Sequence, residues 1–298
     1  MTTKVYLNPA TRHDFVLLFD VKDGNPNGDP DAGNLPRVDP ETMQGLVTDV
    51  CLKRKVRDWV NLTRGTEERM KIYVEHRGIL NNQHERAYTA LGKKSTGSKQ
   101  DRDTINEARE WMCANFFDVR TFGAVMTTGV NCGQVQGPVQ LTFARSVDPI
   151  IPLDLSITRV AVTRPEDAVV TEEGKGGKVT EMGRKALVPY GLYVGYGFFS
   201  PFFANDTGMN EEDLAVFWEA LQNMWEVDRS ASRGFMSCRG LYIFTHEKAM
   251  GNAPAHELFE RIVINHISDV PPRQFSDYKV TVDESNLPAG VNLTRLVG

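Results

Sequence analysis

A polar loop between an apolar strand and a cationic helix holds the residues with the clearest chemical potential. Residues 15–21 are nearly all apolar, and residues 23–30 are rich in Gly, Asn, Asp and Pro. The helix expected next carries three cations within about 100° of one another. These cations are Lys53, Arg54 and Arg57. Backbone N–H groups at a turn, followed by clustered cations, suit a phosphate-rich ligand better than a small apolar one.

The same loop offers two alternative metal sites. The spacing Asp23-x-Asn25-x-Asn27 matches the first half of a calcium-binding EF-hand, but Asn34 stands where the bidentate Glu belongs. Magnesium for phosphodiester cleavage is the other possibility, since hard cations use a few carboxylates plus substrate oxygens. The carboxylates available for it are Asp20, Asp23, Asp29 and Asp31. The simpler interpretation, favoured here, is that these Asp and Asn residues cap turns.

Other catalytic motifs are incomplete. Gly92-Lys-Lys-Ser95 is similar to the end of a phosphate-binding P-loop but lacks the earlier glycine and a leading strand. His84-Glu85 lacks the second histidine of a zinc protease, and no Gly-x-Ser-x-Gly elbow occurs. The four cysteines form no Cys-x-x-Cys pair. We therefore expect no catalytic residue, no bound metal and no cofactor.

The elements that position the loop follow from hydrophobic patterning. Residues 15–21 predict a strand covered on both faces, and residues 42–60 predict a helix that presents its cations near the C-terminal end. An amphipathic helix follows Asn210, which suits an N-cap. Further strands are predicted at residues 139–144, 155–162, 192–199 and 241–246.

The order strand, helix, strands, helix, strand is that of an α+β ferredoxin-like or RNA-recognition-motif core. We expect one elaborated domain over residues 1–298, with insertions at 63–120 and 160–190 and a peripheral tail at 268–298. The first insertion is expected to hold helices at residues 67–73 and 103–117. The glycine-rich residues 172–177 predict the tip of a protruding β-hairpin.

Charge is unevenly distributed along the 298 residues. The formal net charge of −5 argues mildly against a general nucleic-acid coat. Residues 206–228 contain seven acids and no Lys or Arg, whereas residues 53–57, 93–102 and 229–239 are locally basic. This predicts an acidic outer surface beside a basic groove. Neither an export signal nor an apolar run of about 20 residues is present, so we expect a cytoplasmic protein.

Several motifs, taken together and in order, resemble the backbone subunit of the type I-C CRISPR Cascade complex, in the repeat-associated mysterious protein superfamily. The resemblance spans residues 15 to about 267. The motifs that carry it are Asp20-Val-Lys-Asp-Gly-Asn-Pro-Asn-Gly-Asp-Pro30, Pro36-Arg-Val-Asp39, Thr48-Asp-Val-Cys-Leu-Lys-Arg-Lys-Val-Arg57, Gly137-Pro-Val-Gln140, Met182-Gly-Arg-Lys185, Val188-Pro-Tyr-Gly-Leu-Tyr193 and Ser232-Arg-Gly234.

The resemblance implies a modified RNA-recognition-motif palm, a helical fingers insertion and a β-hairpin thumb. It implies a non-catalytic antiviral subunit that polymerises along a CRISPR RNA and presents it for pairing with target DNA. The implied partners are the CRISPR RNA, target DNA through guide pairing, neighbouring copies in a head-to-tail filament, and other Cascade subunits. Those subunits are a guide-processing end-capping subunit, a large subunit and a small subunit; no membrane is involved.

The resemblance also implies roles for individual residues. The expected RNA-binding residues are Lys22, Asn25, Asn27, Lys53, Arg54, Arg57, Met182, Arg184, Lys185, Arg233 and Gly234. The helix cations contact guide phosphates, Met182 is the wedge that displaces a base, and Arg233 with Gly234 lines the opposite wall. The alternative function is a metal-dependent endoribonuclease of the same superfamily that uses a loop aspartate. A calcium-regulated scaffold is a third possibility.

Overall fold

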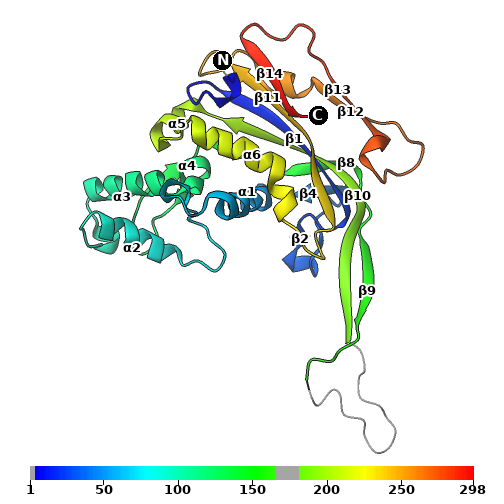
Figure 1. The fold of residues 1–298 in the computed structure, drawn as a ribbon, viewed down its shortest axis with the longest axis horizontal. Coiled ribbons are helices and arrows are strands. Elements are labelled where there is room, and N and C mark those ends of the chain that lie inside the picture. The colour runs from blue at the N-terminus through cyan, green and yellow to red at the C-terminus, as the bar shows by residue number, and fades with distance from the viewer. Residues whose placement is uncertain (1–3, 165–180) are drawn as a thin grey trace, which may run out of the picture.

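A large antiparallel sheet forms the centre of the computed structural model, which describes residues 4–164 and 181–298 (Figure 1). The strands of the sheet are β1 (His13–Gly24), β4 (Gln44–Val47), β7 (Val139–Leu141), β8 (Ala144–Pro149), β9 (Leu153–Arg159), β10 (Glu181–Phe199), β11 (Phe235–His246) and β14 (Val291–Val297). Their order is β14-β11-β1-β10-β8-β4, and β7 and β9 also pair with β10. The fold class is therefore mixed α+β.

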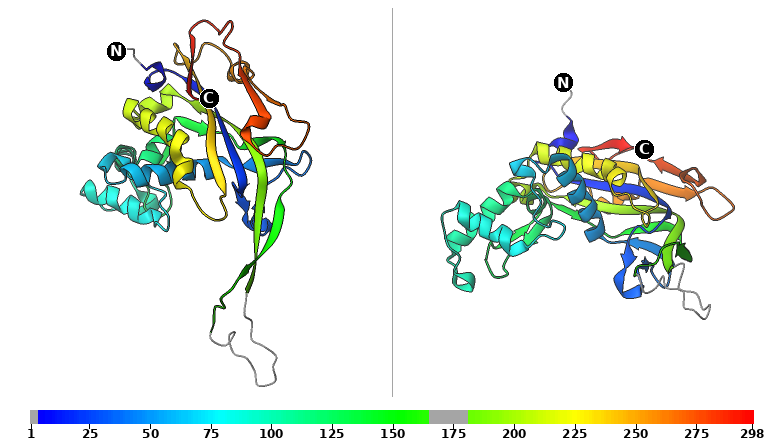
Figure 2. Two further views of the ribbon diagram at one scale, coloured as in Figure 1. Left: turned by 45° about the vertical axis from the view of Figure 1, so that its right-hand side comes forward. Right: turned by 60° about the horizontal axis from the view of Figure 1, so that its bottom comes forward.

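Strand β1 lies between β10 and β11 and is buried on both faces. Phe15, Phe19 and the other odd-numbered apolar residues pack toward helices α1 (Asp49–Arg64) and α6 (Glu211–Val227). Val16 and Leu18 face a second layer on the opposite side. That layer contains α7 (Ala255–Phe259), β12 (Ile262–His266) and β13 (Tyr278–Val282) (Figure 2). The double burial confirms the prediction made from the unbroken apolar run.

The helix predicted at residues 42–60 is wrong in its first part. Gln44–Val47 is strand β4, and α1 begins at Asp49 after the N-cap Thr48, whose Oγ1 accepts from Cys51 N–H at 3.2 Å. Met43 has a φ of 57°, which a right-handed helix does not allow. The few apolar residues before Thr48 fit a helical and a strand period equally well, so patterning alone did not separate the two.

A helical lobe, residues 68–136, packs beside the sheet (Figure 1). It contains α2 (Leu80–Ala90), α3 (Arg102–Asn115), α4 (Phe117–Phe122) and the paired strands β5 (Gly123–Val125) and β6 (Gln134–Gln136). The helix predicted at 67–73 is only a 3-10 turn, because Lys71 is extended and bridges to Phe116. The helix predicted at 103–117 is α3, which ends before the separate helix α4 begins.

Helix α6 confirms the amphipathic helix predicted after Asn210. Asn210 Oδ1 accepts from Asp213 N–H, and Asp213 Oδ2 accepts from Asn210 N–H, each at 3.0 Å, which completes a capping box. The fully buried Arg120 of α4 donates to both carboxylate oxygens of Asp213, at 2.6 and 2.9 Å. Arg69 reaches the same carboxylate at 2.7 Å. The N-terminus of α6 therefore anchors the helical lobe to the body.

Strand β9 and residues 181–187 of β10 form a two-stranded ribbon that projects away from the body (Figures 1 and 2). Strand β9 ends at Arg159, earlier than the predicted 162, and the predicted strand 192–199 is the last part of β10. The predicted hairpin tip at 172–177 lies outside the described residues. At the C-terminus, β14 pairs with β11, so the expected peripheral tail in fact supplies an edge strand of the main sheet.

Helix α5 (Pro201–Thr207) follows β10 directly. Within the described ranges, no helix is both long enough and apolar enough to cross a bilayer.

The buried His13 makes the stability of the fold depend on pH. Its Nε2–H donates to the Asn8 carbonyl at 2.8 Å, Nδ1 lies 3.0 Å from Thr245 Oγ1, and burial lowers the pKa of the imidazole to about 4. The unfolded chain binds this proton near pH 6.5, so neutral His13 stabilises the fold above that pH. We expect about 3 kcal/mol of unfolding free energy to be lost as pH falls from 6.5 to 4.

Chemical denaturation of the wild type and of His13→Gln across this pH range measures the effect. The variant should lose much of the pH dependence, whereas His76→Gln, at an exposed site, should keep it. Parallel pH profiles for wild type and His13→Gln would contradict the assignment.

Candidate nucleic-acid interface

A cavity of about 440 Å³ opens where the loop after β1 meets the first turns of α1. The charged residues that line this cationic pocket are Arg37, Arg54, Lys55, Asp58, Asp228 and Arg233. The four cations come from three segments far apart in the sequence, and they outnumber the two carboxylates. The pocket is therefore a site where an anion can be bound from several directions.

The loop that forms one wall of the pocket is ordered by its own side chains. It contains the paired strands β2 (Gly28–Asp29) and β3 (Leu35–Pro36). Asn27 Oδ1 accepts from both the N–H and the hydroxyl of Thr48 at 3.0 Å, which joins the loop to the N-terminus of α1. Asn25 is buried, and its amide donates to the Asn34 carbonyl at 2.7 Å. Asn25 therefore supports the loop from within instead of facing a ligand.

The pocket cations hold internal partners but keep donors for a ligand. Arg54 uses Nε to bind Asp58 at 2.8 Å, which leaves its two terminal nitrogens available. Arg37 lies 3.3 Å from Asp29, and its buried Nε has no hydrogen-bond partner. The N-terminus of α1 adds backbone N–H groups at the same place. Guanidinium groups and a helix N-terminus together form an arrangement suited to phosphate.

Two other cations strengthen the pocket wall. Lys55 is almost fully buried, pairs with Asp228 and lies over the Trp225 ring, 5.9 Å from its centroid. Burial lowers the pKa of Lys55. Arg233 donates to the carbonyls of Asn25 and Pro26 at 3.1 Å. Arg233 therefore ties the loop between α6 and β11 to the loop after β1.

Lys53 and Arg57 lie outside the cationic pocket, contrary to the expectation that all three helix cations act together. Lys53 pairs with Asp49 at 2.9 Å. The side chains of Lys53 and Arg57 lie over the Phe122 ring, 5.7 Å and 5.4 Å from its centroid. Arg57 binds the buried Asp118 at 2.7 Å. These residues therefore hold the junction of α1 and α4.

The geometry of α1 explains this division. The pocket residues Cys51, Arg54, Lys55 and Asp58 recur at intervals of three and four, so they share one face. Lys53 and Arg57 are four residues apart and follow a different face. The interval of three and four residues that places Lys55 on the face of Arg54 and Asp58 could have identified it as a pocket residue, but we did not predict it. Arg37, also missed, stands inside the motif Pro36-Arg-Val-Asp39 but had no predicted partner element.

The remaining predicted residues lie in two other places. Lys22 is exposed at the end of β1. Gly234 has a φ of 61°, and a Cβ there would lie 2.4 Å from the Asp23 carbonyl oxygen, so its role is close backbone packing. Met182 and Arg184 share one face of the β9–β10 ribbon, whereas Lys185 lies on the other face opposite Leu155.

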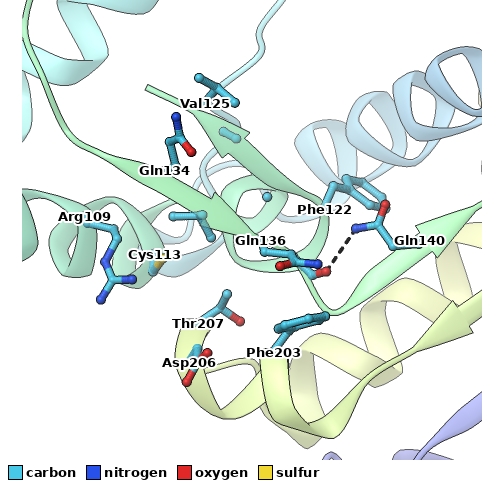
Figure 3. A pocket seen from close by; sticks show the side chains of 14 residues that line it. Arg109, Cys113, Phe122, Val125, Gln134, Gln136, Gln140, Phe203, Asp206 and Thr207 are labelled. Atoms are coloured by element: carbon cyan, nitrogen blue, oxygen red, sulfur yellow. Dashed lines mark hydrogen bonds between the residues drawn. The ribbon is translucent and has the colours of Figure 1, made fainter. Parts of the chain in front are cut away.

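A second cavity, of about 670 Å³, lies between the helical lobe and α5 (Figure 3). Its wall includes Gln134, Gln136, Phe203 and Asp206, and Gln140 donates to the Gly137 carbonyl at 3.0 Å. Arg109 is the single Lys or Arg in the described lining. This cavity is thus less suited to a polyanion than the cationic pocket.

Two of the four aspartates considered as metal ligands, Asp20 and Asp29, have partners within the fold. Asp20 accepts from Arg239 at 2.8 Å and from the Tyr190 hydroxyl at 3.0 Å, and burial raises its pKa. Asp29 accepts from Asp31 N–H at 3.2 Å as an N-cap. In the part of the chain that the structure describes, no three His, Cys, Asp or Glu side chains gather as metal ligands.

The fold was compared with those of solved structures. A chain of a structure described as "CRISPR RNA-guided surveillance complex, pre-nicking" superposes with a TM-score of 0.51 over 78% of both chains, at 15% identity. A chain of a second structure, described as "CRISPR RNA-guided surveillance complex", has a TM-score of 0.47 at 17% identity. The match covers 78% of this chain and 69% of that one. The first of these structures therefore contains a chain with a similar mixed α+β fold.

Sequence comparison defines the family. The family model described as "CRISPR-associated protein Cas7" matches residues 11–283, and the chain belongs to the Cas7 family. A curated relative, "CRISPR-associated protein Cas7" of Haloferax volcanii, is 27% identical over 240 residues. The match covers 73% of this chain and 66% of the length of the relative.

Arg57 and Arg54 should differ in their contribution to stability. Asp118 is 1% exposed and also accepts from the Tyr73 and Val74 N–H groups, so Arg57→Ala leaves a buried carboxylate without its cation. We expect a loss of about 3 kcal/mol in unfolding free energy. The Arg54–Asp58 pair is exposed, so Arg54→Ala should cost less than about 1 kcal/mol. Denaturant unfolding measures both, and equal losses would contradict the division.

Proposed function

We propose that this chain is a non-catalytic backbone subunit of a type I-C Cascade surveillance complex, which binds CRISPR RNA and presents it to target DNA. The observation that carries the proposal is the cationic pocket between the loop after β1 and the N-terminus of α1, in a chain of the Cas7 family. The solved structure with a similar fold is described as an RNA-guided surveillance complex, which supports a guide as the ligand.

The pocket supports recognition of a sugar-phosphate backbone of any sequence. Its donors are guanidinium groups and the helix N-terminus, both of which bind phosphate without reading a base. Asn27 and Thr48 keep the loop and the helix at a fixed separation. A subunit of this kind can hold any guide, because base pairing supplies the sequence specificity.

The sheet supports the proposed modified RNA-recognition-motif palm. Strands and helices follow one another as β1, α1, β8, β10, α6 and β11, and the strands lie in the order β11-β1-β10-β8. This succession is that of a ferredoxin-like core. The second layer covers the middle of the face on which many RNA-recognition motifs stack bases. The proposed palm therefore binds RNA at strand ends and at the pocket.

The two insertions support the proposed fingers and thumb. The helical lobe accounts for most of residues 63–120, and the β9–β10 ribbon falls in and beside residues 160–190. Met182 is 79% exposed on the ribbon, on the same face as Arg184, which pairs with Asp154 at 2.6 Å. We propose Met182 as the wedge and Arg184 as its phosphate partner. Lys185, on the opposite face, acts separately.

The opposite face of the ribbon supports contact between copies. Leu153, Leu155 and Ile157 alternate along β9 and are 40%, 44% and 51% exposed. Such an apolar stripe on a projecting element fits a surface of a neighbouring copy. Head-to-tail contacts of this type continue from copy to copy until another subunit ends the filament.

Removal of two pocket cations should weaken RNA binding. We expect Arg37→Ala with Arg54→Ala to lower affinity for single-stranded RNA at least tenfold in low salt. The slope of log affinity against log salt should fall by about 0.7 for each phosphate that the variant no longer neutralises. Fluorescence anisotropy across a salt series measures both quantities. The double variant Arg102→Ala with Arg295→Ala, equal in charge but outside the pocket, is the control, and equal slopes for the two variants would contradict the proposal.

The proposal also predicts that the chain cuts no RNA. Labelled target RNA paired to a bound guide should remain intact in magnesium or manganese, since Asp29 and Asp20 are engaged by partners within the fold. Gel electrophoresis after incubation measures this. Discrete metal-dependent cuts that disappear in Asp23→Ala or Asp31→Ala would favour the endoribonuclease alternative.

A further inference from the structure

One end of the sheet remains open although its second face is otherwise covered. Val16 and Leu18 are buried under α7 and its neighbours, and Tyr190 packs against Tyr278 of β13. At the end of this face, Lys22 of β1 is the register partner of Phe235 of β11. Lys22 is exposed, and Phe235 is 51% exposed. An aromatic ring therefore stands at the uncovered end of a strand.

Two cations flank the exposed ring. Lys22 is the register partner of Phe235, so both side chains project from the same face. The Arg229 guanidinium lies 5.1 Å from the Phe235 ring centroid, within cation–π distance. Arg229 also pairs with Glu226 at 2.5 Å, which fixes its orientation. Within residues 4–164 and 181–298, the Lys22 ammonium has no hydrogen bond or ion pair.

A similar cation–π pair nearby has a structural role within the fold. Arg239 lies 5.3 Å from the Phe275 centroid and binds the buried Asp20. Phe275 comes from the second layer, so that cation–π pair joins two layers of the structure. The Arg229–Phe235 pair joins no second layer. Phe235 stays 51% exposed, so part of its ring is open to a ligand.

The open ring lies beside the cationic pocket. Arg233 lines the pocket and stands two residues before Phe235, so their Cα atoms are at most about 7 Å apart. Gly234, between them, packs directly on the backbone of Lys22 and Asp23. A single strand whose phosphates occupy the pocket thus has a short path across the loop to the ring.

We propose that Phe235, flanked by Lys22 and Arg229, is a stacking site for one unpaired base of a single-stranded nucleic acid. The inference rests on the proposed function, because the pocket holds the backbone of the same strand. A base stacks on an aromatic ring or a guanidinium plane through its π-face, whatever its identity. Because the base is neutral, the nearby carboxylates Asp23 and Glu226 do not oppose it.

The test compares aromatic and non-aromatic side chains at position 235. Phe235→Leu keeps an apolar side chain without a π-face, and Phe235→Trp enlarges the π-face. We expect Phe235→Leu and Phe235→Ala to bind homopolymeric uridine RNA at least fivefold more weakly, and Phe235→Trp to bind at least as tightly as wild type. The salt slope should be unchanged in all three, since the ring contacts no phosphate.

A matched control is available on α5. Phe202 is also 51% exposed, so Phe202→Ala removes an equally exposed ring away from the pocket and should leave binding unchanged. Thermal unfolding of each variant checks that the fold is intact. Wild-type affinity in Phe235→Leu, with weakened binding in Arg37→Ala/Arg54→Ala, would overturn the stacking site alone. A wild-type chain that binds no RNA would overturn the proposed function and the stacking site together.

Discussion

Burial of β1 on both faces is the constraint from which the positions of the cationic pocket and of the Phe235 site follow. Helices α1 and α6 cover one face, and α7 with β12 and β13 covers most of the other. A ligand cannot reach the middle of such a sheet, so binding groups must stand where strands end and loops begin. The cationic pocket and the open ring of Phe235 both lie at the end of β1 where the covering layers stop.

Helix α1 serves the fold on one side and the proposed ligand on another. Lys53 and Arg57 face Phe122 and the buried Asp118, where their charges hold the helical lobe against the sheet. Arg54 and Lys55 face the pocket one or two residues away along the same helix. The junction of α1 and α4 therefore orients the pocket cations. Loss of Arg57 is expected to lower the stability of the fold, whereas loss of Arg54 is expected to weaken RNA binding.

The sequence predicted the elements whose pattern is local. An unbroken apolar run identified β1, and Asn210 with its apolar stripe identified α6. The start of α1 was placed too early, since Gln44–Val47 becomes a strand only by pairing with β8, about 100 residues away. The motifs of the loop and of α1 pointed to a CRISPR-associated family, which the match to the Cas7 family model confirms, whereas the I-C subtype stays a prediction.

Site residues were harder to predict because their roles depend on partners far away in the chain. Lys53 and Arg57 resembled ligand-binding cations until Phe122 and Asp118 were placed beside them. Asn25 resembled a loop contact, but Ser232 and Asn34 enclose it. Phe235 gave no sequence signal at all, since its exposure follows from where the second layer ends.

A structure of the chain bound to a single-stranded guide RNA is the most direct test of the central claim, that the pocket between the loop after β1 and α1 binds the sugar-phosphate backbone. We expect a phosphate within hydrogen-bond distance of the Arg37 or Arg54 guanidinium, near the N-terminus of α1. A guide path that leaves this pocket filled only with water would contradict it.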